Sequence, residues 1–164
     1  MTYYDEIAVG YEELHREEQE KKLRIIKENL EVKKDDLLLD VGCGTGVTSN
    51  FDCNVTGLDP SSKLLEKCNL SIRLVKAKAE NIPFDDSTFD IVVSVTAIQN
   101  FDDIEKGLRE IRRVGKNRFA LSFLKKSPKA GFIEKKIKEL FKVEKRIEED
   151  KDIIFILSAK HINK

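Results

Sequence analysis

The feature that most constrains the fold of this chain is an apolar segment that runs directly into a glycine-rich turn. Residues 37–46 read LLLDVGCGTG. The apolar run is too short for a helix and stops at glycines, so it predicts a strand that is buried on both faces. Gly42, Gly44 and Gly46 allow a tight turn and let the backbone approach a ligand without Cβ clashes. We therefore expect a ligand to bind where this strand ends.

Asp59 follows this turn at the end of the next expected strand. It closes the segment VTGLD and lies 17 residues after Gly42 (59 − 42). A carboxylate at this place can accept hydrogen bonds from both hydroxyls of a ribose lying across the strand ends. The spacing is G-x-G-x-G with Asp40 just before it, and not the G-x-G-x-x-G that directs a helix N-terminus at a pyrophosphate. The ligand is therefore expected to carry a charged amino-acid end, which Asp40 and strand-end carbonyls can meet.

Strands and short helices alternate along the rest of the chain. Leu23, Ile26 and Leu30 recur at helical spacing in a first helix over 18–31. Further strands are expected at 54–59, 71–77, 89–96 and 117–124, and helical stretches between them at 61–68 and 104–114. This rhythm predicts a mainly parallel sheet with right-handed crossovers.

The C-terminal part is expected to hold one more helix and two strands. The helix covers 130–141, with an apolar face made of Phe132, Ile133, Ile137, Leu140 and Phe141. The strands lie near 143–149 and 153–159, and the tight turn between them makes them antiparallel. The expected fold class is α/β, a Rossmann-like three-layer sandwich with a mainly parallel seven-stranded sheet and an antiparallel C-terminal hairpin strand.

The composition fits one domain. We expect a single domain over residues 1–164, in which 1–34 form an N-terminal helical segment that caps the site and 35–164 form the core. No apolar stretch reaches the ~18 residues of a membrane span, and the acidic N-terminus has no apolar signal core. Cys43, Cys53 and Cys68 are an odd number without C-x-x-C pairing, which argues against a disulfide framework and a zinc site. A cytoplasmic protein without metal or membrane contact is predicted.

The zero net charge hides an asymmetry along the chain. Residues 1–105 hold 12 Lys and Arg against 22 Asp and Glu, whereas residues 106–146 hold 15 against 4. A basic segment of this kind can contact a polyanion such as RNA, although a solvated charged face is the simpler interpretation.

Several motifs together resemble those of one enzyme superfamily. The run LLDVGCGTG, followed by GLD at 57–59, resembles motif I and the ribose-binding acid of the class I methyltransferases that use S-adenosylmethionine (SAM), of the type 11-like kind. AENIPF at 79–84 and STFDIV at 87–92 resemble the A-E-x-L-P-F and S-F-D stretches of the same superfamily. The similarity covers about residues 35–124. The N-terminal tyrosine motif around Tyr4 and Tyr11 is similar to members that synthesise ubiquinone or menaquinone, and SVTAIQNF at 94–101 is similar to ribosomal RNA guanine-N7 methyltransferases.

The resemblance implies SAM as cofactor and a role for each matching position. The glycines would lie along the methionine part and sulfur of SAM, Asp59 would hold the ribose, and Thr96 would offer its carbonyl to the methionine ammonium group. Ala79 and Glu80 would lie near the adenine, although Glu80 could simply begin a helix, and Tyr11 would close over the site or pack within its helix. The implied cofactor-binding residues are Asp40, Gly42, Cys43, Gly44, Gly46, Asp59, Pro60, Ala79, Glu80, Thr96 and Tyr11.

Two positions depart from the superfamily pattern. Lys78 stands where many relatives have an aspartate that accepts the adenine amino group, so adenine recognition must use Glu80 or backbone. Only ten residues separate Gly46 from Gly57, so the first crossover helix is expected to be shortened to one or two turns.

Methyl transfer from a sulfonium is an in-line displacement, in which positioning supplies much of the acceleration. It needs neither a metal nor a covalent nucleophile, so the cysteines are expected to be packing residues, and His15 and His161 to lie on the surface. Gln99 and Asn100 are the candidate catalytic residues, because their amides can orient an amine or ring nitrogen of the acceptor. Phe101 could stack on a planar acceptor, but core packing is the better interpretation for it.

Three functions remain open for a SAM-binding chain. In the first, which we favour from the sequence because the chain is compact and has no inserted lid, the acceptor is RNA or a translation-related protein, contacted through the basic segment 106–146. A small activator subunit could then add a strand to the exposed edge strand 71–76, as in related RNA and translation-factor methyltransferases that need a small zinc-binding subunit. In the second, the acceptor is a small aromatic or quinone-like molecule. In the third, the chain is a SAM-binding module without catalysis.

Overall fold

The computed structural model describes the backbone of residues 3–160 and the side chains of residues 12–160. Seven strands form one sheet in the order β3-β2-β1-β4-β5-β7-β6. The strands are β1 (Leu37–Val41), β2 (Asn54–Asp59), β3 (Arg73–Lys76), β4 (Phe89–Ser94), β5 (Gly115–Leu124), β6 (Phe141–Glu148) and β7 (Asp152–Ala159). Strands β1 to β5 are parallel to one another, and β7 is antiparallel to both β5 and β6. The predicted fold class is therefore confirmed.

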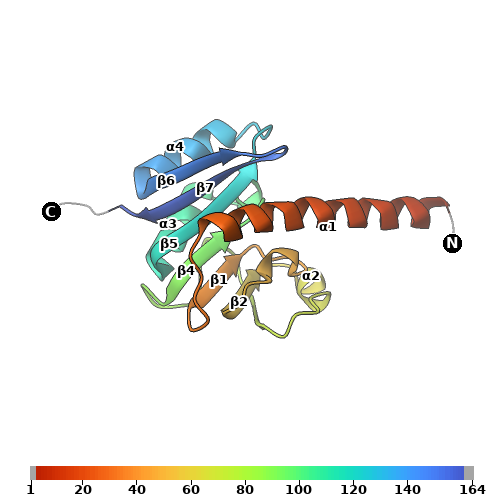
Figure 1. The fold of residues 1–164 in the computed structure, drawn as a ribbon, viewed down its shortest axis with the longest axis horizontal. Coiled ribbons are helices and arrows are strands. Elements are labelled where there is room, and N and C mark those ends of the chain that lie inside the picture. The colour runs from red at the N-terminus through yellow and green to blue at the C-terminus, as the bar shows by residue number, and fades with distance from the viewer. Residues whose placement is uncertain (1–2, 161–164) are drawn as a thin grey trace.

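Helices cover both faces of this sheet. They are α1 (Tyr3–Asn29), α2 (Ser62–Glu66), α3 (Ile104–Val114) and α4 (Ala130–Leu140), with short 3-10 turns at Val47–Ser49 and Ile98–Asn100. Figure 1 shows α1 crossing one face of the sheet and extending past its edge, while α3 and α4 lie on the other face. None of the helices in the described part of the chain has the length and apolarity that crossing a bilayer requires.

The first crossover is too short to cover its face of the sheet, and α1 packs on this face. The crossover from β1 to β2 contains a single 3-10 turn, as its ten residues predicted. Leu23 and Ile26 of α1, and Leu30 directly after it, are buried against Phe51 and the sheet. The helix spacing read from the sequence is therefore confirmed, and α1 does the packing that a longer crossover helix would otherwise do.

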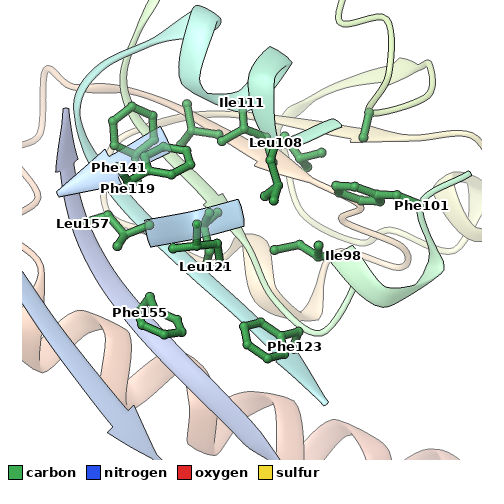
Figure 2. Packing of buried hydrophobic residues seen from close by; sticks show 14 of the residues in the cluster. Ile98, Phe101, Leu108, Ile111, Phe119, Leu121, Phe123, Phe141, Phe155 and Leu157 are labelled. Atoms are coloured by element: carbon green, nitrogen blue, oxygen red, sulfur yellow. The ribbon is translucent and has the colours of Figure 1, made fainter. Parts of the chain in front are cut away.

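The larger core lies on the opposite face, beneath α3 and α4 (Figure 2). The rings of Phe119 and Phe141 meet edge to face with centroids 4.9 Å apart, and those of Phe123 and Phe155 stack at 6.1 Å. Aromatic pairs of this geometry add to the free energy gained by burial. They link β5, β6 and β7, and so stabilise the half of the sheet that contains the antiparallel strands.

Two local predictions need correction. Phe132 was placed on the buried face of α4, but it is 47% exposed, and the ammonium group of Lys136 lies over its ring at 5.6 Å. Phe141, also expected on this face, is the first residue of β6, so Ile133 and Ile137, at helical spacing, carry the buried face of α4. The strand expected to reach residue 96 ends at Ser94, because Thr96 takes a left-handed backbone conformation with φ of 55°.

Candidate functional site

The turn after β1 depends on glycine for steric reasons. Gly42, Gly44 and Gly46 have φ values of 76°, 55° and 90°, in the left-handed region that other L-residues avoid. A Cβ atom on Gly42 would lie 2.6 Å from the Cβ of Ala97, and one on Gly46 would lie 2.6 Å from the Sγ of Cys68. A Cβ on Gly44 would meet nothing nearer than 4.0 Å, so this glycine borders open space.

Asp59 joins the glycine turn to the loop after β2. Its Oδ2 accepts a hydrogen bond from the amide of Gly44 at 2.9 Å, and its Oδ1 accepts one from the amide of Ser61 at 2.8 Å. The side chain is almost fully buried at the end of β2. Each oxygen of a carboxylate can accept more than one hydrogen bond, so Asp59 can also bind hydroxyl groups.

A cavity of about 1190 Å³ opens beside this pair. It lies at the carboxyl ends of the parallel strands, where β1 and β4 are neighbours and the strand order reverses. Open α/β sheets bind ligands at this topological switch point. The volume exceeds the roughly 300–1,000 Å³ of a pocket for one small molecule, so a donor and an acceptor could lie side by side.

Most of the predicted cofactor-binding residues come together in this cavity. Those that line it are Gly42, Cys43, Gly44, Asp59, Pro60, Ala79, Glu80 and Thr96, together with the candidate catalytic residue Asn100. Asp40 and Gln99 lie beneath its surface, and Gly46 lines a smaller adjoining pocket. The side chain of Tyr11 falls outside the described residues, as does His161.

α1 forms one wall of the cavity through residues that were not singled out from the sequence. Its lining residues on this helix are Glu12, Glu13, His15, Arg16 and Gln19. His15, expected at the surface, is one of them. Residues 12, 15, 16 and 19 follow helical spacing, so the signal was present as a polar stripe on the helix that buries Leu23 and Ile26. The cavity therefore has an N-terminal helix as one of its walls.

Asp40 supports the glycine turn from beneath. Its side chain is fully buried, and its Oδ2 accepts hydrogen bonds from the hydroxyls of Thr48 at 2.9 Å and Ser49 at 2.7 Å. Its Oδ1 has no hydrogen-bond partner among the described residues. Burial raises the pKa of Asp40 to about 7, although the two hydroxyls act in the opposite direction. This carboxyl group can thus change its charge near neutral pH.

Thr96 is held in an unfavourable conformation at the edge of the cavity. A left-handed φ at a β-branched residue costs about 1–3 kcal/mol, so the surroundings must impose it. The amide of Thr96 donates to the hydroxyl of Ser122 at 3.0 Å, and its own hydroxyl donates to Asp152 at 2.6 Å. Its carbonyl oxygen accepts from the side-chain amide of Gln99 at 2.8 Å. Gln99 therefore orients Thr96, whereas Asn100 faces the cavity.

The cavity wall includes Lys78, one of the two departures from the superfamily pattern. The ammonium group of Lys78 lies 2.7 Å from Asp102, and both side chains are largely exposed. This pair brings a carboxylate to the wall where the sequence supplies a lysine. Glu80 does not begin a helix; it lies in a turn, and its carboxylate accepts a hydrogen bond from the amide of Asp103 at 2.8 Å, just before α3.

Cys43 packs against β2 and is not activated. A Cβ on Gly57 would lie 2.8 Å from its Sγ, so the small strand residue makes room for the thiol. Burial raises the pKa of Cys43 well above its usual value, which keeps the thiol protonated. Among the described residues, no group of histidine, cysteine and acidic side chains could hold a metal ion.

Most of the basic side chains after residue 106 are already engaged within the chain. Eight of the fifteen basic side chains in residues 106–146 form ion pairs with carboxylates: Arg109, Arg113, Lys116, Arg118, Lys136, Lys138, Lys142 and Arg146. Three more donate to backbone carbonyl groups: Arg112, Lys125 and Lys129. The ion pairs reduce the positive charge that this segment can offer to a polyanion.

The family model described as "Methyltransferase domain" matches residues 39–121, just over half of the chain, including the glycine turn, Asp59 and Thr96. The chain belongs to this methyltransferase family. The match and the geometry place it in the class I SAM-dependent methyltransferase superfamily, as the sequence motifs predicted.

Individual relatives are similar over part of their length. An uncharacterized protein of Methanocaldococcus jannaschii is 34% identical over 120 residues, which cover 70% of this chain and 47% of that protein. A demethylmenaquinone methyltransferase of Thermotoga maritima is 32% identical over 142 residues, covering 78% of this chain and 62% of its own. The chain spans about half the length of the curated relatives that it matches.

Among solved structures, a Haloferax volcanii methyltransferase in complex with the Trm112 methyltransferase activator has a similar fold. Its TM-score is 0.76 at 16% identity, over 94% of this chain and 96% of that chain. At this level of identity the likeness concerns the fold.

Proposed function

We propose that this chain is a SAM-dependent methyltransferase that binds SAM in the cavity between α1 and the carboxyl ends of β1, β2 and β4. One observation carries the proposal. The Asp59 carboxylate and the left-handed Gly42–Gly44 turn border the same cavity and are joined by a hydrogen bond of 2.9 Å. Membership of the methyltransferase family makes SAM the ligand that this pair fits best.

The lining residues offer partners for each part of the donor. Asp59 would accept from the ribose hydroxyls. The methionine ammonium group would be met by the carbonyl of Thr96, with the negative charge of ionised Asp40 nearby. Arg16 on α1 lines the cavity and is suited to the methionine carboxylate, a role the sequence analysis did not assign. Ala79, Pro60 and Glu80 would surround the adenine.

SAM supplies a methyl group on a sulfonium, which an acceptor nucleophile displaces in line with the thioether leaving group. The protein contributes to this reaction by positioning donor and acceptor. The glycine turn and the held conformation of Thr96 fix the donor, and Asn100 is placed to orient the acceptor. We assign residues 1–34 as the cap of the site and 35–164 as the core, because Glu12 to Gln19 line the cavity that the core forms.

The charges around the cavity favour a small acceptor over RNA. Its wall carries five carboxylates, on Glu12, Glu13, Asp59, Glu80 and Asp102. The permanent cations there are Arg16, Lys67 and Lys78, of which Lys78 is neutralised by Asp102. Such a wall repels phosphates, and eight of the fifteen basic side chains in the segment 106–146 are already paired with carboxylates of this chain. We therefore place a small aromatic or quinone-like acceptor first, in line with the Thermotoga relative.

A macromolecular acceptor with an activator subunit is the second candidate. The Haloferax neighbour, whose chain matches this one over nearly its whole length, is in complex with a methyltransferase activator. The outer edge of β3 pairs with no strand of the described sheet, and Leu74 on it is 36% exposed. An open strand edge can receive a strand from a partner by main-chain hydrogen bonding.

Two measurements test the proposal. Calorimetry with SAM and with its demethylated product should show binding of both. Incubation with radiolabelled SAM and fractionated cell extract should then place label in the small-molecule fraction; label in RNA or protein would select the second candidate. Donor binding without transfer to any fraction would identify a non-catalytic SAM-binding module, and absence of donor binding would refute the proposal.

A further inference from the structure

A buried ion pair joins α1 to β7, the last strand along the chain. The ammonium group of Lys22 lies 3.0 Å from Oδ1 of Asp152, the first residue of β7. The two side chains are 2% and 0% exposed. The ammonium group also donates to the side chain of Gln19 at 2.8 Å and to the hydroxyl of Thr96 at 3.0 Å. Lys22 thus lies where α1 changes from packing on the sheet to lining the cavity.

The same cluster holds Thr96 in its left-handed conformation. The other oxygen of Asp152 accepts from the hydroxyls of Thr96 at 2.6 Å and Ser122 at 2.8 Å. The hydroxyl of Thr96 therefore accepts from Lys22 and donates to Asp152 at once. Asp152, Lys22 and Thr96 form a closed set of contacts between α1, the end of β4 and the start of β7.

A buried ion pair of this kind is not an efficient way to stabilise the fold. Removing a lysine and an aspartate from water carries a large desolvation penalty, and well-packed apolar residues at such positions are often equally stable or better. An apolar pair could not donate to Thr96 or accept from it. The charged pair is therefore suited to fixing a geometry, namely the position of α1 relative to Thr96.

We propose that the Lys22–Asp152 ion pair is a positioning element that holds the cavity-lining part of α1 and the backbone of Thr96 in register for donor binding. Gln19 and Thr96, both contacted through this cluster, line the cavity, whereas Lys22 and Asp152 do not. The inference rests on the proposed function, since the ligand whose affinity it controls is SAM.

The chain provides a matched control for this pair. Lys21 directly precedes Lys22, and Asp150 lies two residues before Asp152. Their side chains form an ion pair between the same two regions at the surface, with Nζ and Oδ2 2.7 Å apart and side-chain exposures of 45% and 79%. Exposed ion pairs of this kind contribute little to the free energy of unfolding. The test set is Lys22→Met, Asp152→Asn, the double variant, and the control Lys21→Met with Asp150→Asn. The double variant removes both buried charges, so it avoids leaving one of them without its partner.

Donor affinity is measured by calorimetry at a temperature where circular dichroism shows each variant folded. We expect each single variant to weaken SAM binding by about tenfold or more, the double variant to lose less than the product of the two, and the surface control to match the wild type. The KM for SAM should rise more than kcat falls. Wild-type affinity in the folded single variants, or an equal loss in the surface control, would overturn the proposal.

Amide hydrogen exchange without any ligand separates this inference from the proposed function. Faster exchange confined to residues 12–19 and Thr96 in Lys22→Met and Asp152→Asn supports the positioning role, even in a chain that binds no SAM. Unchanged exchange in these segments overturns it. Failure of the wild type to bind SAM refutes the proposed function only.

Discussion

The carboxylate of Asp59 accepts a hydrogen bond from the amide of Gly44 at 2.9 Å, which joins the end of β2 to the turn after β1. The second oxygen of Asp59 holds the amide of Ser61 in the same way. One side chain thus positions two loops that border the cavity, and it keeps acceptor capacity for a ribose.

Asp59→Ala should weaken SAM binding by about tenfold to a hundredfold, which corresponds to about 1.4–2.8 kcal/mol. It should also lower the free energy of unfolding by about 1–3 kcal/mol, because two backbone amides lose a charged acceptor. Calorimetry and urea unfolding measure the two effects. Asp52→Asn, at the opposite end of β2, is the control. Unchanged donor affinity in Asp59→Ala would remove the basis of the proposed function.

Gly42→Ala and Gly44→Ala should differ in stability although both glycines are left-handed. Each alanine should lower the free energy of unfolding by about 1–2 kcal/mol, because the left-handed conformation is unfavourable for a residue with a Cβ. Only the Cβ at position 42 would clash, 2.6 Å from the Cβ of Ala97, whereas position 44 has free space. Gly42→Ala should therefore have the lower Tm. Equal Tm values would show that the Gly42–Ala97 contact relaxes without cost.

Asp40 should give stability a pH dependence of unusual sign. Its pKa in the folded protein is about 7, above the ordinary 3.8, because the side chain is buried. Between these values the folded state keeps a proton that the unfolded state has lost, so stability falls as pH rises and levels off above about pH 7. From about pH 5 to pH 8 the loss should approach about 3 kcal/mol.

Asp40→Asn should remove this dependence, since the amide oxygen can still accept from Thr48 and Ser49 without a charge. Urea unfolding of both proteins across this pH range gives the difference directly. Parallel curves for the two proteins would mean that Asp40 stays ionised when buried.

The edge of β3 should matter only if an activator binds there. Leu74→Glu places a charge on the exposed edge and should leave the Tm and the SAM affinity nearly unchanged. In the second candidate function it should abolish stimulation by a Trm112-type protein and co-elution with it. A purified wild-type chain that is monomeric and fully active alone would exclude the need for such a partner.

Local patterns in the sequence predicted the elements and the centre of the site. The run LLLDVGCGTG placed β1 and a turn that only glycine can form, because steric exclusion at a single residue decides where φ can be positive. The apolar spacing of Leu23 and Ile26 placed the packed face of α1, and the position of Asp59 at a strand end placed the acid beside the turn. These inferences need only neighbouring residues and the geometry of a parallel sheet.

Other features required the closed fold. Lys22 and Thr96 are 74 positions apart, and no local pattern shows that they share Asp152. The same holds for the hydrogen bond from the amide of Asp103 to Glu80 and for the ion pairs of Arg118 and Lys116. Such contacts depend on which surfaces the chain brings together when it buries its core, and a side chain's partner is then chosen by distance in space. The sequence by itself therefore determined the elements, the turn and the acid, whereas the tertiary structure decided the walls of the cavity and the conformation of Thr96.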